Sequence, residues 1–440
     1  MKRMINRAVL AAAAAFMATG AAYAAAPSIS NVVMTQQEGS RIVKITYDLA
    51  NEAAIVTLGI ETNNVAIPDG AVTRLTGDVC KVVQPGSRTI TWNAGADWPE
   101  NLTQVARAKV VAWTTNAPPL YCAVDVVGGT SAADYPVYYY VSAEAVPEGV
   151  TNDLYKTTRI LMRQIPATGA GGFEMGSPEG ETGRNNAREA KHTVVLTKAF
   201  YAGVYEVTQS QWQQVMGDVQ PWPSWLNNND YRLTRPVEDV SYYEIRENND
   251  NTAMETSWPQ SDAVAAGSFM GRLRSKTVLG GFDLPTEAQW EYACRAGKTG
   301  ALNDGTVNIT NVTSDAQLGA LGRYKFNGGY VDGTVEPARD CTTANASAAV
   351  GSYAPNMWGL YDMHGNVFEW CLDWHTDNIG TAAAEDPVGL EVPLEGSPNS
   401  LRGGSWFAGA EYCRSANRGA DGGRWVRHSS YGFRLVRNLP

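Results

Sequence analysis

Three observations predict a two-domain protein in which an all-β sandwich precedes a larger α+β domain. The chain has 440 residues, which exceeds the size of one ordinary hydrophobic core. Residues 27–115 contain short β-branched segments separated by Asn, Gly and Pro clusters, a pattern typical of an immunoglobulin-like sandwich. From Arg159 the composition becomes rich in Trp and Gly with few long periodic runs, so we expect irregular loops, two or three helices and short strands.

The N-terminus has the order of features found in a secretory signal. Three basic residues precede an apolar run at 8–17, and Ala-Tyr-Ala at 22–24 has the small-x-small pattern of a signal peptidase site. We therefore expect residues 1–24 to be removed and the protein to be exported to the periplasm, the cell surface or the medium. An Ala-rich structural helix is the alternative. After residue 26, no run is long and apolar enough to span a bilayer.

The charge balance argues against a nucleic-acid partner. The formal net charge is −10, and loss of the three basic residues of the signal changes it to −13. Binding to nucleic acid depends on Lys and Arg that neutralise phosphates, and this chain has no excess of them. The acidity fits cation binding, although a solvated acidic surface is the simpler explanation.

Five segments of the predicted sandwich are β-branched or partly alternating, as strands are. They are residues 29–34, 41–49, 54–60, 88–92 and 104–113. A connector is expected from 116 to 155, in which Tyr138-Tyr139-Tyr140 form a candidate edge strand. The larger domain is then expected over 156–440.

Two helices of the larger domain are predicted from their ends, over residues 208–217 and 286–297. In each, a Thr and a Gln three residues later form a capping-box pattern, and a Gly marks the stop. The capping pairs are Thr208 with Gln211 and Thr286 with Gln289, and the stops are Gly217 and Gly297. Residues 262–275 are a third candidate helix. The acidic, Asn-rich segment 244–257 is predicted to be a surface insertion.

Residues 358–374, WGLYDMHGNVFEWCLDW, gather aromatic and acidic side chains more closely than any other stretch. Gly365-Asn366 is the strong turn signal, and Asp362, Glu369 and Asp373 lie on both sides of it. Ca²⁺ prefers oxygens from carboxylates and from carbonyls that a tight turn aims inward, so this stretch is a candidate calcium site. On charge placement alone, the simpler interpretation is that the acids cap a turn and face water.

Other metal or nucleophile sites have little support. The histidines, His192, His364, His375 and His428, lack the spacing of a zinc or iron site, and no G-x-S-x-G, P-loop or Cys-x-x-Cys is present. The best candidate for chemistry is LRGGSWFAGAEYC at 401–413, in which two glycines allow close backbone approach and Ser405 is expected to face a groove. A core strand with a disulfide-bonded Cys413 is the alternative.

Taken together, these segments resemble the formylglycine-generating enzyme, or sulfatase-modifying factor, family. The matching stretches, in the family's order over about 270 residues, are FEMGS at 173–177, FYAGVYEVTQSQW at 200–212, RPVEDVS at 235–241, DLPTEAQWEYACRAG at 283–297, NMWGLYDMHGNVFEWCLDW at 356–374, LRGGSW at 401–406 and YGFRLV at 431–436. The resemblance implies a compact, loop-rich fold related to C-type lectins. It also implies an extracytoplasmic role in acting on or binding polypeptide or glycan.

Active members of the family that this chain resembles oxidise a substrate cysteine to formylglycine, using oxygen and copper held by two cysteines. The family pattern is G-G-S-[FW]-x-C-x-x-x-x-C. Here Ser405 is retained, Ala408 stands at the first cysteine and Cys413 at the second. Because Cu(I) strongly prefers paired thiolates, one cysteine leaves the metal without half of these ligands. We therefore expect an incomplete catalytic centre without copper.

The resemblance also implies calcium ligands. The family's turn motif places a side-chain oxygen at Asp362, carbonyls at Gly365 and Val367 and a carboxylate at Glu369, and the glutamate of its Y-E-V motif falls on Glu206. Another ligand region of the family, near 327–345, aligns poorly, which leaves the number of ions open.

The six cysteines of an exported chain permit disulfides, with fifteen full pairings. We expect bonds from Cys294 to Cys413 and from Cys341 to Cys371. A third bond from Cys80 to Cys122 is the expectation for the N-terminal part, with plain buried thiols as the alternative.

The leading hypothesis is an exported, calcium-stabilised family member that has lost the oxidase centre and serves as a binding or accessory protein. One alternative is a working enzyme, either an oxidase with an unusual site or a member with different, non-heme metal chemistry. The missing cysteine argues against the first of these and the unclustered histidines against the second. Another alternative is a lectin-like glycan binder, for which the many Trp and Tyr residues are compatible but are also explained by core packing.

Overall fold

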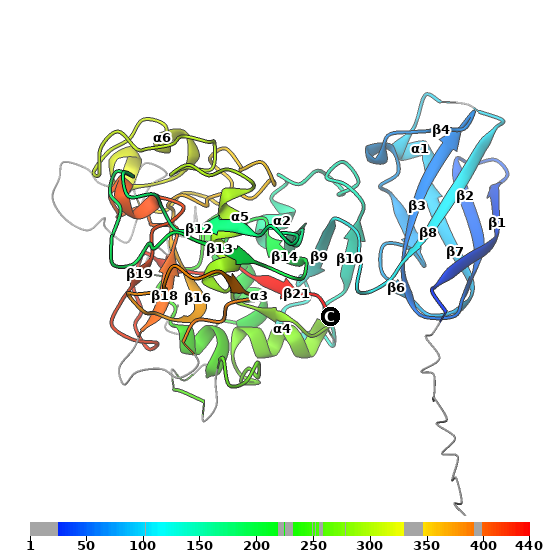
Figure 1. The fold of residues 1–440 in the computed structure, drawn as a ribbon. Helices are drawn as coiled ribbons and strands as arrows, with labels where there is room; N and C mark the ends of the chain where they lie inside the picture. Colours follow the sequence, from blue (N-terminus) through cyan, green and yellow to red (C-terminus); the bar gives the residue numbers. More distant parts are fainter. Residues whose placement is uncertain are drawn as a thin grey trace, which may run out of the picture.

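The computed structural model describes residues 25–101, 103–218, 224, 232–248, 250, 252–254, 258–277, 279–329, 346–390 and 398–440. Residues 1–24, which carry the predicted signal, lie outside this part. Figure 1 shows a β-rich N-terminal domain beside a larger C-terminal domain, with strand β10 on the side of the larger domain that faces the smaller one.

Two antiparallel sheets form the N-terminal domain. One has the order β1(Ser28–Gln36), β2(Ile42–Ala50), β7(Gly86–Asn93) and β5(Leu75–Gly77). In the other, β3(Ala54–Thr62) pairs with β4(Val65–Ala66), β6(Val82–Val83) and β8(Ala106–Trp113). Alternate residues of β2, among them Ile45 and Tyr47, are buried in a shared core with Trp92, as expected where two sheets pack face to face. All five predicted strands overlap strands of these sheets; the immunoglobulin-like class stays a prediction.

The main sheet of the C-terminal domain has the order β10-β9-β11-β14-β21-β15. Its strands are β9(Tyr121–Asp125), β10(Val137–Tyr140), β11(Arg159–Ile165), β14(Phe200–Gly203), β15(Phe282–Asp283) and β21(Val436–Asn438). The segment predicted to be a connector thus supplies two strands, and the three tyrosines lie on the edge strand β10. All five residues of β9 are buried, because this strand lies between β10 and β11 inside the sheet.

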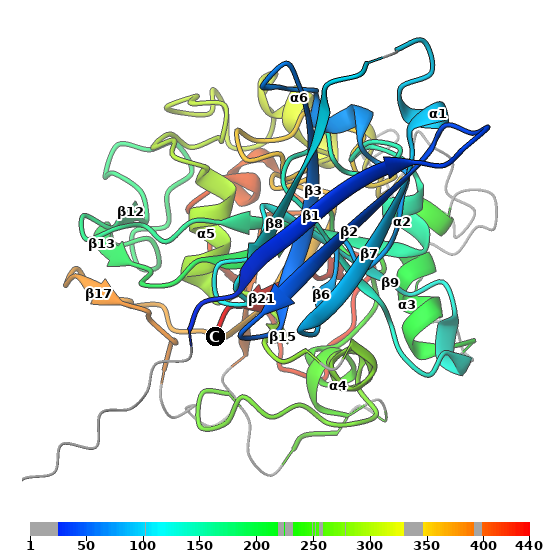
Figure 2. The same ribbon diagram turned by 90° about the vertical axis from the view of Figure 1, so that its right-hand side faces the viewer.

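Two smaller sheets complete the C-terminal domain. One has the order β19(Gly419–Ala420), β18(Asn399–Arg402), β16(Phe368–Trp374) and β20(Tyr431–Gly432), and the other has the order β12(Phe173–Met175), β13(His192–Val195) and β17(Ala384–Glu385). Most of these strands are only two to four residues long, so loops make up much of the domain, in agreement with the predicted α+β, loop-rich class. Figure 2 shows the sandwich strands in front of this domain.

Three helices of the C-terminal domain, α3(Gln209–Met216), α4(Phe269–Thr277) and α5(Glu287–Arg295), exceed two turns. Shorter helical segments are η1(Asp69–Ala71), α1(Ala94–Asp97), η2(Gly129–Ser131), α2(Leu154–Thr157), η3(Arg232–Thr234), η4(Tyr243–Glu247), α6(Leu318–Leu321), η5(Lys325–Gly329) and η6(Ala410–Cys413). Both predicted capping boxes are confirmed, at Thr208 and at Thr286. The α3 helix ends at Gly217 as predicted, whereas α5 ends one residue early because Ala296, with φ of 45°, takes the left-handed position.

Two predictions about the region before α5 are wrong in part. The third helix begins at Phe269 rather than at 262. The segment predicted to be a surface insertion begins with the buried turn η4, in which Arg246 forms an ion pair of 2.9 Å with Asp283. Its charged composition suggested solvation, but a buried partner satisfies the charge instead. Residues 249, 251 and 255–257 of this segment lie outside the described residues.

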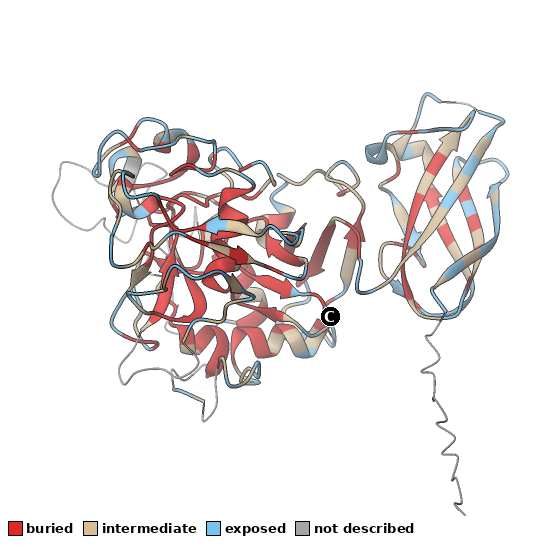
Figure 3. Cartoon of the chain, viewed as in Figure 1, coloured by how far each residue is buried: buried red, intermediate tan, exposed pale blue. Residues whose placement is uncertain are grey.

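The centre of the C-terminal domain is buried, as Figure 3 shows by its red interior. Trp212 stacks on Phe269 with ring centroids 5.3 Å apart, and Phe433 meets Phe269 edge-on at 5.2 Å. These rings pack α3 and α4 against the C-terminal strands. No helix in the described part of the chain is long and apolar enough to cross a membrane.

Candidate functional site

The turn at Gly365-Asn366 joins three distant parts of the chain. The Gly365 N–H donates to Gly403 O at 2.7 Å, and the Asn366 N–H donates to Arg323 O at 2.7 Å. Gly365 has φ of 111°, and a Cβ there would lie 2.1 Å from Arg323 O, so this position requires glycine. The Trp406 N–H donates to Asn366 O at 2.8 Å, and the turn therefore holds the segment that follows Gly403 at two points.

The acids around this turn are buried, so the simpler interpretation that they face water is wrong. Glu206 Oε2 accepts from the Asn366 side chain at 2.6 Å and Oε1 accepts from the Val367 N–H at 3.1 Å. Asp362 Oδ2 accepts from the Gly351 N–H at 2.6 Å, while its buried Oδ1 has no hydrogen-bond partner among the described residues. Burial raises the pKa of Asp362 to about 6, and burial and the charge of Asp362 raise the pKa of Glu206.

Glu369 is already fully engaged. Arg434 donates three hydrogen bonds to the Glu369 carboxylate, two from Nε and one from Nη2, and the shortest of them is 2.8 Å. Trp290 Nε1 donates a fourth at 2.7 Å. Both residues of this ion pair are nearly inaccessible to solvent, so the carboxylate and the guanidinium neutralise each other. Glu369 would have to exchange one of these hydrogen bonds to bind a cation.

The predicted calcium ligands therefore divide into two groups. Neither Asp362 nor Glu206 forms an ion pair within the described residues, burial raises the pKa of both, and the unpartnered Oδ1 of Asp362 is an oxygen of the type that Ca²⁺ prefers. Glu369 is compensated by Arg434. Among the described residues, no group of three or more His, Cys, Asp or Glu side chains is arranged to hold a metal ion, so a calcium ion here would depend on carbonyl oxygens as well.

Asp373, the third acid of the stretch, has a different location. Its Oδ2 accepts from the Glu287 N–H at 2.8 Å, at the first turn of α5. Burial and the nearby charge of Glu287 raise the pKa of Asp373 to about 7. Glu287 responds in the opposite sense: burial acts to raise its pKa, but Arg418 and Arg402 outweigh this and lower it to about 2.

The segment after Gly403 forms one wall of a groove of about 420 Å³, which we call the Ser405 groove. Ser405 and Ala408 both line it. Five aromatic side chains also line it: Phe326, Phe368, Phe407, Tyr412 and Tyr431. Phe326 and Tyr412 are 55% and 46% exposed, which leaves ring surface available to a ligand.

Cys413 does not line the groove. It is fully buried, and a Cβ at Gly404 would lie 2.4 Å from its sulfur, so Gly404 covers the thiol. Burial raises the pKa of this thiol to about 12, which keeps it protonated at neutral pH. Of the two positions that the family pattern assigns to copper, one is therefore a methyl group and the other a covered thiol, and these residues do not fit a copper ion.

The predicted disulfides are wrong for the described cysteines, since Cys80, Cys122, Cys294, Cys371 and Cys413 are all free thiols. The ring of His364 lies between Cys294 and Cys413, with Nε2 4.0 Å from Cys294 Sγ and Nδ1 2.7 Å from Cys413 O. Strand β10 separates Cys80 from Cys122, because Tyr139 opposes Cys122 in β9 and donates its N–H to Cys80 O. Cys341 lies outside the described residues.

The histidines do not form a metal centre in this structure. His364 Nε2 accepts from the Asn303 N–H at 3.0 Å, so Nδ1 carries the proton and donates to Cys413 O. Burial lowers the pKa of His364 to about 4, which keeps the ring neutral. His192 and His375 are buried elsewhere, and His428 lines the Ser405 groove beside Ser430.

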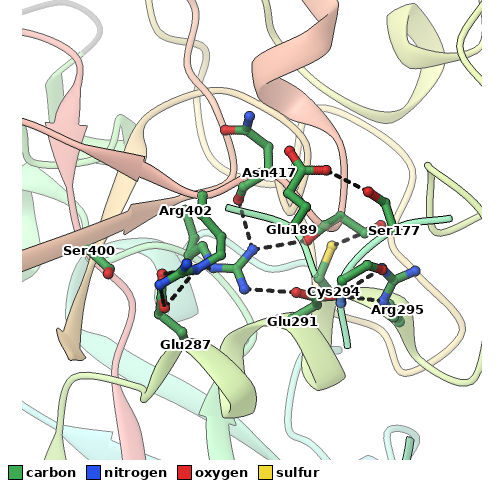
Figure 4. A network of polar contacts seen from close by, with 12 residues as sticks. Ser177, Glu189, Glu287, Glu291, Cys294, Arg295, Ser400, Arg402 and Asn417 are labelled. Atoms are coloured by element: carbon green, nitrogen blue, oxygen red, sulfur yellow. Dashed lines mark hydrogen bonds and ion pairs between the residues drawn. The ribbon is translucent and has the colours of Figure 1, made fainter. Parts of the chain in front are cut away.

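A buried ion-pair network supports the groove from behind, and the sequence analysis did not predict it. Arg402, directly before Gly403, binds Glu291 at 2.8 Å and lies 3.5 Å from Glu287, both on α5 (Figure 4). Glu291 also binds Arg295 at 2.7 Å. The sequence signal was the Glu291–Arg295 pair, four residues apart on α5, together with the Arg of LRGGSW.

The fold and the site define a class of protein: a loop-rich α+β domain in which a buried acidic turn supports an aromatic groove. Residues 153–439 match the model of the sulfatase-modifying factor enzyme 1-like domain. The chain belongs to this family. The family assignment agrees with the resemblance found in the motifs.

Several known proteins are similar to parts of the chain. The serine/threonine-protein kinase pkn1 of Chlamydia pneumoniae is 33% identical over 156 residues, which cover 36% of this chain and 21% of the kinase. The formylglycine-generating enzyme of Streptomyces coelicolor is 32% identical over 204 residues, which cover 45% of this chain and 55% of the enzyme. The chain thus spans less than two thirds of each relative. Among solved structures, PvdO from Pseudomonas aeruginosa has 25% identity and a TM-score of 0.47, with 64% of this chain and 95% of PvdO covered.

The elevated pKa of Asp373 predicts a pH dependence of stability. The folded-state pKa of about 7 exceeds the ordinary value of 3.8, so the folded protein binds the proton more tightly than the unfolded chain. The contribution of Asp373 to the free energy of unfolding therefore falls as pH rises from about 4 to about 7. The amide oxygen of Asp373→Asn can still accept from the Glu287 N–H. Between pH 5 and pH 8, the Tm of this variant should therefore decrease less than the Tm of the wild type.

Thermal melts of the wild type and Asp373→Asn at matched ionic strength measure this effect. Asp304→Asn is the matched control, because Asp304 is exposed and its oxygen accepts from the Thr306 N–H as an amide oxygen can. Parallel Tm profiles for the wild type and Asp373→Asn would show that Asp373 is not protonated in this range.

Proposed function

We propose that this chain is an exported, calcium-stabilised family member that binds a polypeptide or glycan in the Ser405 groove and does not catalyse formylglycine formation. The observation that carries the proposal is that the groove has an open aromatic lining but presents no thiol to a ligand. The groove retains Ser405, but Ala408 is a methyl group and Cys413 is covered by Gly404. Such a site offers stacking surface and hydrogen-bonding groups without a redox-active metal ligand.

The aromatic rings suit a polymeric ligand. Phe326, Phe407 and Tyr412 expose ring faces or edges that can stack on a sugar or on an apolar side chain. The lining includes one basic side chain, Lys325, and one acidic side chain, Glu411, so the groove has no dominant charge. The groove volume of about 420 Å³ accommodates a few amino-acid residues or sugar units, and the rest of a longer ligand would extend outside the groove.

Calcium would act on stability rather than on chemistry. Asp362, Glu206 and the carbonyls of Gly365 and Val367 would hold it, and Glu369 could join by exchanging a hydrogen bond with Arg434. The ion would neutralise two buried carboxylates that now repel each other. Since the same turn fixes Gly403 and Trp406, a rigid turn would keep the groove wall in place.

Calcium should raise the melting temperature of the purified mature protein. An ion that binds only the folded state adds about 2.7 kcal/mol at a hundredfold excess over its dissociation constant. Asp362→Asn should abolish most of this shift, and Glu385→Gln, at an exposed acid, should retain it. Differential scanning calorimetry in calcium and in EDTA measures both. An EDTA-insensitive wild type would rule out the calcium site.

The enzymatic alternative is favoured by the relatives that are named formylglycine-generating enzymes, and one assay separates it from our proposal. The protein is loaded with Cu(I) under reducing conditions and incubated with oxygen and a cysteine-containing sulfatase peptide. We expect no mass loss from aldehyde formation, because neither Ala408 nor covered Cys413 supplies a thiolate. Turnover by the wild type would refute the proposal. Copper binding by Ala408→Cys, but not by Ala408→Ser, would support it.

Binding in the groove is tested with a glycan array and a random peptide array probed in parallel. Tyr412→Ala removes an exposed ring and should lower the affinity for every true groove ligand at least severalfold. Trp425→Ala is the control, since Trp425 is 54% exposed but does not line the groove. A binding role for the groove would be contradicted if neither array showed binding, or if Tyr412→Ala left the affinity for every ligand unchanged.

A further inference from the structure

Strand β10 is an edge strand, and its free edge faces the N-terminal domain (Figure 1). Its antiparallel partner is β9, with Val137 opposite Val124 and Tyr139 opposite Cys122. In such a ladder, hydrogen bonding to the partner strand alternates along the chain. The Asp125 N–H donates to Pro136 O at 2.8 Å, which places the main-chain groups of Pro136, and by alternation those of Tyr138, toward β9.

The main-chain groups of the intervening residues therefore point away from β9. Two of them have partners: the Tyr135 N–H donates to Lys276 O, and the Tyr139 N–H donates to Cys80 O, both at 2.7 Å. Val137 lies between them, and within the described residues its N–H and C=O have no hydrogen-bond partner. Val137 is half-buried, and an unpaired main-chain donor and acceptor on an edge strand can form hydrogen bonds with another polypeptide.

These free groups lie on the wall of a cleft of about 940 Å³, which we call the interdomain cleft. The sandwich contributes one wall through residues such as Thr76 and Lys81. The edge of β10 forms the second wall, and Lys276, Thr277 and Leu279 also line the cleft. A space of this size lies within the range of volumes found for ligand sites.

The charged residues of the cleft differ in how far they are already neutralised. Arg159 binds Asp125 at 2.9 Å and stacks on Tyr138, and Lys276 Nζ donates to the carbonyls of Gly129 and Thr130. Lys81 lines the cleft and has no ion pair within the described part of the chain. Asp134, which is exposed, is the carboxylate among the lining residues. The cleft therefore offers the ammonium group of Lys81 together with the unpaired main-chain groups of Val137.

We propose that the interdomain cleft binds an extended peptide segment that carries a carboxylate. One residue of the peptide exchanges two main-chain hydrogen bonds with Val137, in the manner of strand addition. Its acidic group binds Lys81, and an adjacent side chain packs on the half-buried ring of Tyr138. Because Tyr135 and Tyr139 are already occupied, the pairing is limited to a single residue, and side-chain contacts supply the rest of the affinity. This site is separate from the Ser405 groove.

The test begins with selection of peptides from a random 12-residue display library on the purified mature protein. Selected peptides are synthesised with a fluorophore and titrated by fluorescence polarisation. Val137→Pro removes the free N–H at an edge position where proline is tolerated, and should weaken binding at least tenfold. Val137→Thr keeps the N–H and should bind within about twofold of the wild type. Lys81→Glu should weaken binding severalfold, and more strongly at low salt.

Tyr412→Ala separates the two sites, because a cleft ligand should bind this groove variant normally. Hydrogen exchange provides a second readout that does not require Val137→Pro to fold: the Val137 amide should exchange rapidly alone and become protected with peptide. Failure to select any peptide would overturn the proposal. So would peptides that leave the Val137 amide unprotected and bind Lys81→Glu with the same affinity as the wild type. Oligosaccharide binding that protects this amide in place of peptide would overturn it as well.

Discussion

The turn at Gly365-Asn366 is the constraint on which the rest of the C-terminal domain depends. It is bound to Arg323, to Gly403 and Trp406, and to Glu206 after β14, so four segments far apart in sequence meet at two residues. The close approach of Arg323 O excludes any side chain at Gly365. A domain with so many short strands has few long ladders of main-chain hydrogen bonds, and a shared turn of this kind replaces them in fixing the loops. The groove wall is therefore determined by the turn more than by the sheet from which it leaves.

Buried ion pairs provide the other long-range links, in the places where disulfides were expected. Arg402 connects β18 to α5, Arg434 connects the C-terminal segment to β16, and Arg414 binds Glu181 and Glu189 with distances of 2.6 and 2.7 Å. A buried pair contributes little net stability compared with an apolar pair, but loss of one partner leaves an uncompensated charge that costs about 3 to 5 kcal/mol. These links consequently specify one arrangement of the loops. Asp362 and Glu206 are the exception, because their charges are not balanced in the same way.

The sequence predicted those features whose cause is local. The capping boxes at Thr208 and Thr286 depend on residues three apart, and the five sandwich strands depend on β-branched residues between turn signals. The features that it did not predict depend on distant partners. Strand β9 lies in the segment predicted to be a connector, because its burial comes from pairing with the distant strand β11. The η4 turn lies in the segment predicted to be a surface insertion, because the partner of Arg246, Asp283, is 37 residues away in the sequence. At the site, the motif predicted which residues belong together, but not that Glu369 is engaged by Arg434 or that His364 separates Cys294 from Cys413. Charge placement alone also failed to predict that the acids of the turn are buried.

The separation of groove and thiol follows from the geometry of Gly403-Gly404. Both glycines have positive φ, which lets the chain pass directly over Cys413, and the Ser405 N–H donates to the sulfur beneath. The sulfur is thus part of the support of the groove floor, as the buried side chains of Ala410 and Leu318 are. Ala408 contributes a methyl group to the groove lining and belongs to the same buried cluster as Cys413, against which Phe368 packs. Under the function that we propose, the groove keeps a binding surface without the oxidase chemistry, because its shape depends on the turn and the ion pairs whereas that chemistry would need two thiols.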